Sequence, residues 1–222
     1  MPSFYHEYER FYVSVDCVIF GFSGGNLKLL IQKRPYEPGL GEDSLIGGFI
    51  GKDESVNAAA SRVLTYFTGL EDVYMQQLGV FGEVERDPGE RVISVVFYAL
   101  IDVRAYNENL SEKRNARWID IDNLPRLCLD HNEMVEKARE ALKSRINNEP
   151  IGSNLLPELF TLSQLQSLHE SILGYPIDKR NFRRSVLSHG LIERTEKMDK
   201  ESSRRGAALF KFAKETRKRG NE

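Results

Sequence analysis

The 222-residue chain lacks the features that place a protein in several special classes. No apolar run approaches the roughly 20 residues needed to cross a bilayer, and the charged, aromatic start MPSFYHEYERFY does not have the pattern of a secretory signal. Cysteine is scarce: Cys17 and Cys128 are the only two, and neither has a second potential ligand nearby in sequence. A disulfide framework and a zinc site are therefore disfavoured, and the sequence indicates two reduced thiols in a cytoplasmic protein.

Charge is divided unevenly along the chain. Residues 151–222 contain 14 Lys and Arg against nine Asp and Glu, a net charge of +5, whereas residues 1–150 have a net charge of −7. The helical pattern stops at NNEPIGSN, and we place a domain boundary there, near residue 150. We call 1–150 the front domain and 151–222 the back domain. The basic back domain favours nucleic acid or another polyanion as its partner.

The front domain shows a mixed pattern of strands and helices. Expected strands are rich in β-branched and aromatic residues and cover 11–22, 27–34, 74–86, 91–103 and 116–122. Apolar residues at three- and four-residue steps predict a helix over 54–69 that ends at Gly69. A second helix is expected over 130–146, with Asp130 as its N-cap and Glu133 three residues further on.

The back domain has the order of a winged helix-turn-helix. Thr161 and Gln164 have the spacing of a capping box at the start of one helix, and Asp178 can cap a second helix that stops at Gly190. Two strand-like segments, LIER and AALFKFA, follow on either side of a charged turn. Helix, short turn, helix and then a hairpin is typical of a DNA-binding module.

The second of these helices is a candidate recognition helix. Phe182 and Val186 are four residues apart and are expected to face the first helix, while basic and amide side chains crowd the N-terminal half. Arginine suits guanine and asparagine suits adenine by bidentate geometry, and wing residues suit phosphate or minor-groove contact. A solvated basic surface is the plainer interpretation of the same residues. The candidate DNA-binding residues are Lys179, Arg180, Asn181, Arg183, Arg184, Arg204, Arg205 and Lys211.

The segment GGFIGKDESVNAAASRVLTYFTGL, residues 47–70, resembles the Nudix box, G-x5-E-x7-R-E-U-x-E-E-x-G-U with U apolar. Gly48, Glu54, Arg62 and Gly69 keep their positions and spacing. The resemblance implies an α/β (α+β) Nudix-like sandwich, with the box forming a loop, a helix and a second loop. We expect Glu54 and Arg62 to form an ion pair that braces the loop against the helix.

Three acidic positions of the box are changed in this chain. The family's glutamates hold Mg²⁺ against a diphosphate, because a hard divalent cation needs several oxygen ligands. Here Val63, Tyr66 and Phe67 occupy those positions and offer no carboxylate. The sequence therefore predicts no enzymatic activity, no catalytic residues, no metal and no cofactor. Glu83 or Glu85, on the following strand, would have to replace the lost ligands in an active hydrolase.

Nearly the whole chain is similar to the Nudix-related transcription regulators of the NrtR type, and the similarity is weakest before residue 10 and after about residue 213. The run LPELFTLSQLQ…DKRNFRR carries this resemblance most specifically. It implies a homodimeric regulator that binds double-stranded operator DNA through the back domain. We expect repression that is relieved when the front domain binds a small effector, because the bound dimer no longer matches its half-site spacing.

The resemblance leaves the effector open between two branches, and few basic residues near the box favour a neutral sugar, an arabinose-like pentose, over ADP-ribose. This would make the protein a regulator of carbohydrate metabolism. The alternatives are an ADP-ribose-responsive regulator of NAD metabolism, an active Mg²⁺-dependent Nudix hydrolase with an appended nucleic-acid-binding domain, and an interaction protein with an acidic partner. The expected effector contacts flank the Nudix cleft and are Asp16, Lys33, Arg34, Ser44, Phe49, Glu83 and Tyr98.

Overall fold

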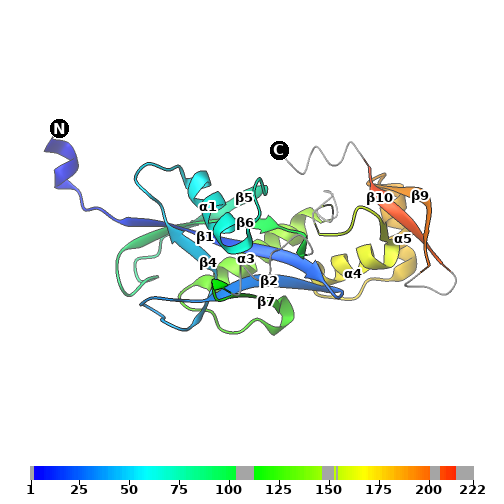
Figure 1. Ribbon diagram of the computed structural model, residues 1–222, viewed down its shortest axis with the longest axis horizontal. Coiled ribbons are helices and arrows are strands. Elements are labelled where there is room, and N and C mark those ends of the chain that lie inside the picture. Colours follow the sequence, from blue (N-terminus) through cyan, green and yellow to red (C-terminus); the bar gives the residue numbers. More distant parts are fainter. Residues whose placement is uncertain (1–2, 104–112, 147–152, 154, 201–205, 214–222) are drawn as a thin grey trace.

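The fold is an elongated arrangement of two parts, the front domain at one end and the back domain at the other (Figure 1). It is seen in a computed structural model that describes residues 3–103, 113–146, 153, 155–200 and 206–213. A short 3-10 helix, η1 (Ser3–Glu7), extends away from the front domain. Within the described ranges, no helix has the length and apolar character needed to cross a membrane.

A mixed β-sheet forms the centre of the front domain. Its main path runs β3-β2-β1-β6-β5, while β4 pairs with β1 and β7 pairs with β2. Strand β1 is parallel to β6 and antiparallel to β2 and β4. The strands are β1 (Tyr12–Ser23), β2 (Asn26–Lys33), β3 (Asp43–Ser44), β4 (Ile46–Phe49), β5 (Met75–Phe81), β6 (Val92–Leu100) and β7 (Ala116–Asp120).

One helix covers each face of this sheet. Because side chains alternate along a strand, Cys17 and Ile19 of β1 pack against α1 (Val56–Thr68), whereas Val18 and Phe20 pack on the side of α3 (His131–Arg145). Helix α1 begins at Ser55, whose side chain accepts a hydrogen bond from the N–H of Ala58, and ends at Gly69 in a left-handed conformation. The predicted Nudix-like sandwich and the end of the box helix are confirmed.

Several strands end earlier than expected, and β6, for example, ends at Leu100, three residues before the predicted end. Strand β5 ends at Phe81, five residues before the predicted end, and residues 82–91 form turns instead. Arg86 lies in this irregular segment and is buried. A 3-10 helix, η3 (Ile121–Asn123), follows β7 where a continued strand was predicted.

The back domain has the expected winged-helix elements. A capping box between Thr161 and Gln164 starts α4 (Leu162–Leu173), and the Asp178 side chain accepts the N–H of Asn181 at the start of α5 (Lys179–Ser188). A small antiparallel sheet has the order β8-β10-β9. Its strands are β8 (Phe160–Thr161), β9 (Ile192–Asp199) and β10 (Ala207–Phe212).

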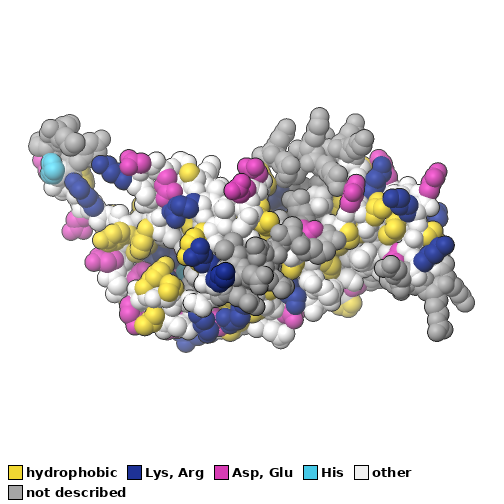
Figure 2. Space-filling view, viewed as in Figure 1, with side chains coloured by type: hydrophobic (Ala, Val, Ile, Leu, Met, Phe, Trp, Pro, Cys, Tyr) yellow, Lys and Arg dark blue, Asp and Glu magenta, His cyan; other side chains and the backbone are white. Residues whose placement is uncertain are grey.

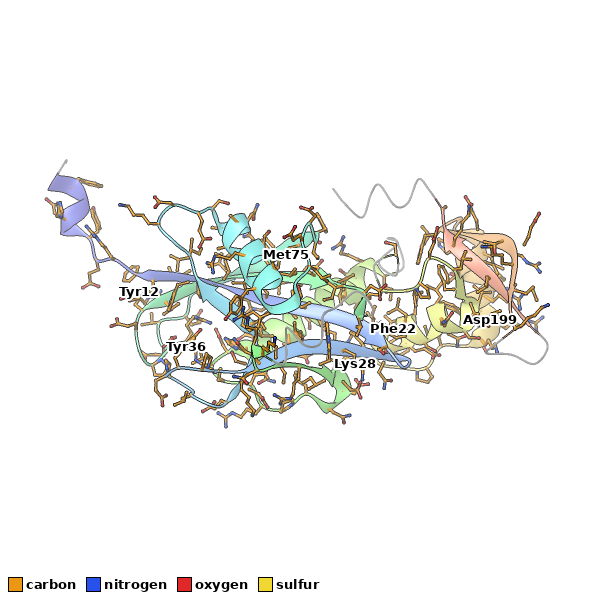
Figure 3. All side chains as sticks on the ribbon, viewed as in Figure 1. Tyr12, Phe22, Lys28, Tyr36, Met75 and Asp199 are labelled. Atoms are coloured by element: carbon orange, nitrogen blue, oxygen red, sulfur yellow. The ribbon has the colours of Figure 1, made fainter. Side chains whose placement is uncertain are left out.

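The end of the β1–β2 hairpin contacts α4. The backbone N–H of Leu27 donates to Oγ of Ser171 (2.9 Å), and that hydroxyl donates to the carbonyl oxygen of Gly25 (3.2 Å). Figure 3 places Phe22 and Lys28 at this end of the hairpin, next to the back domain. One continuous apolar core includes Leu29 in the front domain and Leu168 in the back domain. The boundary predicted near residue 150 lies outside the described residues and stays a prediction.

This shared core predicts that a cavity in the back domain destabilises the front domain. Leu168→Ala removes a fully buried side chain and should cost about 2–5 kcal/mol of unfolding free energy. Urea unfolding followed by the fluorescence of Trp118, the only tryptophan and a front-domain residue, should show a lower midpoint. Leu187→Ala, at a side chain 45% exposed, is the matched control and should change it little. An unchanged Trp118 midpoint in Leu168→Ala would contradict the shared core.

Candidate functional site

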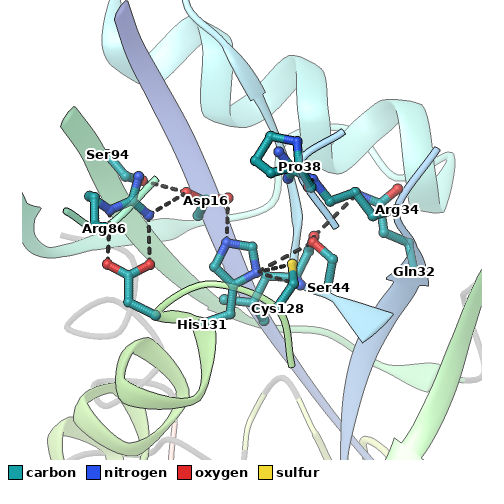
Figure 4. Close-up of polar contacts among 11 residues, drawn as sticks. Asp16, Gln32, Arg34, Pro38, Ser44, Arg86, Ser94, Cys128 and His131 are labelled. Atoms are coloured by element: carbon teal, nitrogen blue, oxygen red, sulfur yellow. Dashed lines mark hydrogen bonds and ion pairs between the residues drawn. The ribbon is translucent and has the colours of Figure 1, made fainter. Parts of the chain in front are cut away.

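A polar cleft opens at the end of the sheet that lies away from the back domain. Strands β1 and β2, the β3–β4 segment, the 82–91 loop and the start of α3 all contribute to it, and Figure 4 shows its central contacts. Arg34 at the end of β2 donates from Nε to the carbonyl oxygen of Pro38 (2.5 Å), which holds the loop at the cleft. The lining residues are Ser14, Asp16, Gln32, Arg34, Tyr36, Ser44, Leu45, Gly47, Gly48, Phe49, Arg86, Asp87, Leu129 and His131.

A buried guanidinium joins the carboxylates of this cleft. Arg86, with a side chain 3% exposed, donates from Nε and Nη2 to the two oxygens of Asp130 (2.8 and 2.7 Å). Its Nη2 lies 4.0 Å from Asp16 Oδ2, which also accepts the hydroxyl of Ser94. Burial alone opposes the charge of Arg86, but the hydrogen bonds that Arg86 donates to Asp130, together with the charges of the nearby aspartates, outweigh burial and raise the pKa of Arg86.

The role predicted for Asp130 was wrong. Its side chain makes no capping hydrogen bond to α3, because both oxygens accept from Arg86. A capping interaction can be inferred from spacing of three residues, but this contact joins residues 44 apart. Sequence spacing therefore could not show that Asp130 pairs with Arg86, a residue that lines the cleft.

His131 lies at the same helix start and is neutral in this arrangement. Its Nδ1 accepts the backbone N–H of Leu45 (3.2 Å), so the ring proton belongs on Nε2, which lies 3.8 Å from Asp16 Oδ1. Burial lowers the pKa of His131, against the opposing effect of the Asp16 charge. This buried imidazole lines the cleft.

Four of the seven predicted effector contacts line this cleft. Asp16, Arg34, Ser44 and Phe49 come from four separate segments and meet there. Ser44 is buried and its hydroxyl donates to the carbonyl of Leu45 (2.8 Å). Their placement agrees with the expectation, while their contact with an effector stays a prediction.

The other three do not line the cleft. Lys33 alternates with Gln32 and Arg34, so it points away, and its Nζ pairs with Asp43 (3.0 Å). Glu83 is exposed on the 82–91 loop, outside the cleft lining. Tyr98 is 3% exposed and donates to Oε1 of Gln76 (2.7 Å) on the side of α3. Strand position alone could not separate these side chains from the cleft residues.

A second cavity of about 390 Å³ adjoins the cleft beside α1. Gln32, Tyr36 and Gly47 line both spaces. Sequence analysis missed Lys113 and Arg114, which come just before β7 and reach this cavity; the basic run EKRNAR was their one signal. The remaining lining residues are Pro35, Arg62, Val63, Tyr66, Phe67 and Asn115.

The predicted ion pair next to the box helix is present, but the side chains there do not suit a metal ion. Arg62 donates from Nε and Nη2 to the two oxygens of Glu54 (3.0 and 2.6 Å), which confirms the predicted ion pair. The hydrogen bond from Arg62, together with that from the N–H of Gly51, lowers the pKa of Glu54 to about 2. Val63 and Phe67 are buried in the core. With Glu54 committed to Arg62 and no acid beside it on α1, the donor set does not suit Mg²⁺. The described residues contain no metal-binding cluster of His, Cys, Asp and Glu.

Helix α5 presents a basic surface to solvent. Its Phe182 is buried, and the five predicted contact residues on the helix are all exposed; Figure 2 shows Lys and Arg side chains on the surface of this end of the molecule. Lys211 on β10 pairs with Glu193 (3.2 Å), which makes it less available to phosphate than predicted. Arg204 and Arg205 lie outside the described residues. The exposed set is Lys179, Arg180, Asn181, Arg183 and Arg184.

His169 of α4 packs against α5. The imidazole packs edge-on against the ring of Phe182, with centroids 5.0 Å apart. Burial lowers the pKa of His169 from its usual 6.5 to about 4. The contact therefore needs the neutral ring, which a positive charge would disrupt.

Comparison with known proteins matches both halves of the chain. Residues 10–140 match the NUDIX domain family, and residues 152–212 match the NrtR DNA-binding winged helix domain. The chain is 31% identical over 211 residues to the ADPR responsive transcriptional repressor NtrR of Acinetobacter baylyi, which covers 93% of this chain and 84% of that protein.

Two solved structures are similar as well. Shewanella oneidensis NrtR complexed with a 27mer DNA is 32% identical, with a TM-score of 0.80 over 92% of this chain and 94% of that one. The NUDIX domain of the same protein complexed with ADP ribose is 30% identical, with a TM-score of 0.55 over 62% of this chain and 92% of that one.

The prediction of a sugar effector, and with it a role in arabinose or carbohydrate metabolism, was wrong. The similar proteins are described by their response to, or complex with, ADP-ribose. The error came from counting basic residues close to the box in sequence. Lys113 and Arg114 lie beside the box helix in space, although Arg114 follows Tyr66 by 48 residues.

The depressed pKa of His169 predicts a loss of stability in mild acid. Above pH 6.5 the ring is neutral in both the folded and unfolded chains. Between pH 6.5 and about 4, only the unfolded chain gains the proton, so the unfolding free energy falls as pH falls. The drop in unfolding free energy between pH 7 and pH 5, measured by urea unfolding, should be about 2 kcal/mol smaller in His169→Leu than in the wild type. His6→Leu, at an exposed histidine, is the control; an equal drop in His169→Leu would contradict this account.

Proposed function

Because the chain belongs to the NrtR-type family of Nudix-fold, winged-helix regulators, we propose that it is a transcriptional repressor that responds to ADP-ribose. The front domain binds the effector in the two adjoining cavities, and α5 of the back domain binds operator DNA. The observation that carries the proposal is the exposed basic first half of α5 on a domain that shares its core with the effector domain. Two back domains of a homodimer would read the two halves of an operator.

Two elements connect the cleft to the back domain. Strand β1 carries Asp16 at the cleft, and the hairpin it begins ends on α4 at Ser171. Helix α3 starts with His131 in the cleft and is followed by Ile146, which lines a small space against Phe182 of α5. An effector that binds one orientation of these elements better than another shifts the spacing of the recognition helices.

We propose that the front domain does not hydrolyse its ligand. The donor set of α1 does not suit the metal ion that Nudix hydrolysis uses. Glu83 and Glu85, the acids that could replace lost ligands, are both exposed, and neither lines the cleft or the cavity. Mg²⁺-dependent release of AMP from ADP-ribose that is lost in Glu54→Gln would instead support the hydrolase alternative.

Removing two cations from α5 should weaken DNA binding. The double variant Arg183→Ala, Arg184→Ala loses phosphate or base contacts, so the affinity should fall and the slope of log K against log salt should decrease by up to about 2. Fluorescence anisotropy with a duplex selected by the wild-type protein from a random pool measures both. Lys137→Ala with Lys143→Ala on α3 removes the same charge from the front domain and is the control. An equal loss in both double variants would refute a specific role for α5.

ADP-ribose should release the protein from this duplex, whereas L-arabinose should not. At 100 times its dissociation constant the effector should also add about 2.7 kcal/mol to the unfolding free energy. Gly47→Ala should abolish the response, because an added Cβ would come within 2.3 Å of Asp16 Oδ1.

The matched control is Gly79→Ala, where an added Cβ meets no atom within 4 Å. It should keep both DNA binding and release by ADP-ribose. Release by arabinose, or release by ADP-ribose that persists in Gly47→Ala, contradicts the proposed effector site.

A further inference from the structure

All the charged side chains that line the cavity beside α1 are cations. Arg62, Lys113 and Arg114 contribute to it, and its lining residues include no Asp or Glu. The polar cleft next to it is different, since its two arginines, Arg34 and Arg86, are matched by Asp16 and Asp87. Of the two spaces, the cavity is therefore the one whose charge calls for an anionic ligand group.

Arg114 is held in place by an aromatic ring. Its guanidinium carbon lies 3.7 Å from the centroid of the Tyr66 ring, and its Nη1 donates to the Tyr66 hydroxyl (2.7 Å). A stacked guanidinium keeps most of its five N–H donors available at its edge. Nε of Arg114 is buried with no hydrogen-bond partner among the described residues, and none of the described carboxylates pairs with this side chain. No carboxylate among the described residues therefore neutralises this guanidinium.

Tyr66 sits on α1 at a position where the box pattern has an acid. Of its neighbours in the box, Val63 and Phe67 are buried, and Glu54 is taken by Arg62. At the box positions that would carry metal ligands, α1 instead presents Tyr66, on which Arg114 stacks. A positive charge is present at the place where a metal ion would be needed, and it belongs to the chain itself.

We propose that Arg114, stacked on Tyr66 and assisted by Lys113, binds the diphosphate group of the effector without a metal ion. This assignment rests on the proposed function in that ADP-ribose is taken as the effector. Gln32, Tyr36 and Gly47 line both the cleft and the cavity, so one extended ligand can place its diphosphate at Arg114 and an uncharged end in the cleft. Charge-assisted bidentate hydrogen bonds suit arginine and phosphate oxygens.

The test is isothermal titration calorimetry of the full chain with ADP-ribose and with inorganic pyrophosphate, each in EDTA and in Mg²⁺. The wild-type protein should bind both in EDTA, with an ADP-ribose affinity that Mg²⁺ does not increase. Arg114→Gln should weaken ADP-ribose by about 10- to 100-fold in either buffer and should abolish the pyrophosphate signal. Tyr66→Leu, which keeps the charge but removes its support, should cause a smaller loss for both ligands.

Two controls separate a lost contact from a lost fold. Lys52→Gln removes an exposed lysine that lines neither space and should bind like the wild type. Adenosine, which has no phosphate, should have the same affinity for the wild type and Arg114→Gln, and the two proteins should have the same melting temperature.

The outcomes also separate this proposal from the proposed function. Pyrophosphate binding that needs Arg114, without ADP-ribose binding, would keep the anion site and overturn the effector. ADP-ribose binding that requires Mg²⁺, or that is unchanged in Arg114→Gln, would keep the effector and overturn the metal-free site. Failure of both ligands to bind in either buffer would overturn both.

Discussion

The buried carboxylate of Asp16 is the constraint around which the cleft is arranged. A charge taken out of water is costly unless it is paired and hydrogen-bonded. Asp16 lies in β1 among fully buried apolar residues, and its compensation comes from the hydroxyl of Ser94 on β6 and the guanidinium of Arg86 on the 82–91 loop. Arg86 in turn needs Asp130 at the start of α3. One acidic side chain thereby specifies how a strand, a loop and a helix meet.

This network also explains why two adjoining spaces differ in character. The charged side chains of the cleft already neutralise one another. The cleft therefore favours an uncharged ligand group that forms hydrogen bonds. The positive charges beside α1 are neutralised only in part. Glu54 pairs with Arg62, but no acidic residue lines the cavity next to Lys113 and Arg114. A ligand with an anionic segment next to an uncharged one matches both, and a neutral pentose matches only the first.

Local spacing made most of the fold predictable, and long-range contacts made part of the site unpredictable. The caps at Thr161 and Asp178 are three-residue patterns, and the Glu54–Arg62 pair lies within one box, so the sequence carried them directly. The Arg86–Asp130 and Arg114–Tyr66 contacts join residues 44 and 48 apart. The sugar interpretation was wrong because it counted only the basic residues near the box in sequence. Lys113 and Arg114 lie beside the box helix but come from a distant part of the chain. The prediction that Tyr98 contacts the effector had a related weakness, because a strand pattern does not say which helix covers a given residue.

The connection between the two domains limits how an effector can act on DNA binding. A ligand shifts a conformational equilibrium only by its differential affinity for the two states. Strand β1 and helix α3 each contribute to the cleft at one end and lead to the back domain at the other. A small reorientation at Asp16 or His131 is therefore passed to α4 and α5 through packed elements, since a close-packed core moves in whole segments and does not absorb strain locally. In the proposed regulator, the apolar core shared by both domains would make the back domain sensitive to the state of the cleft, and a ligand that is not hydrolysed would hold that state.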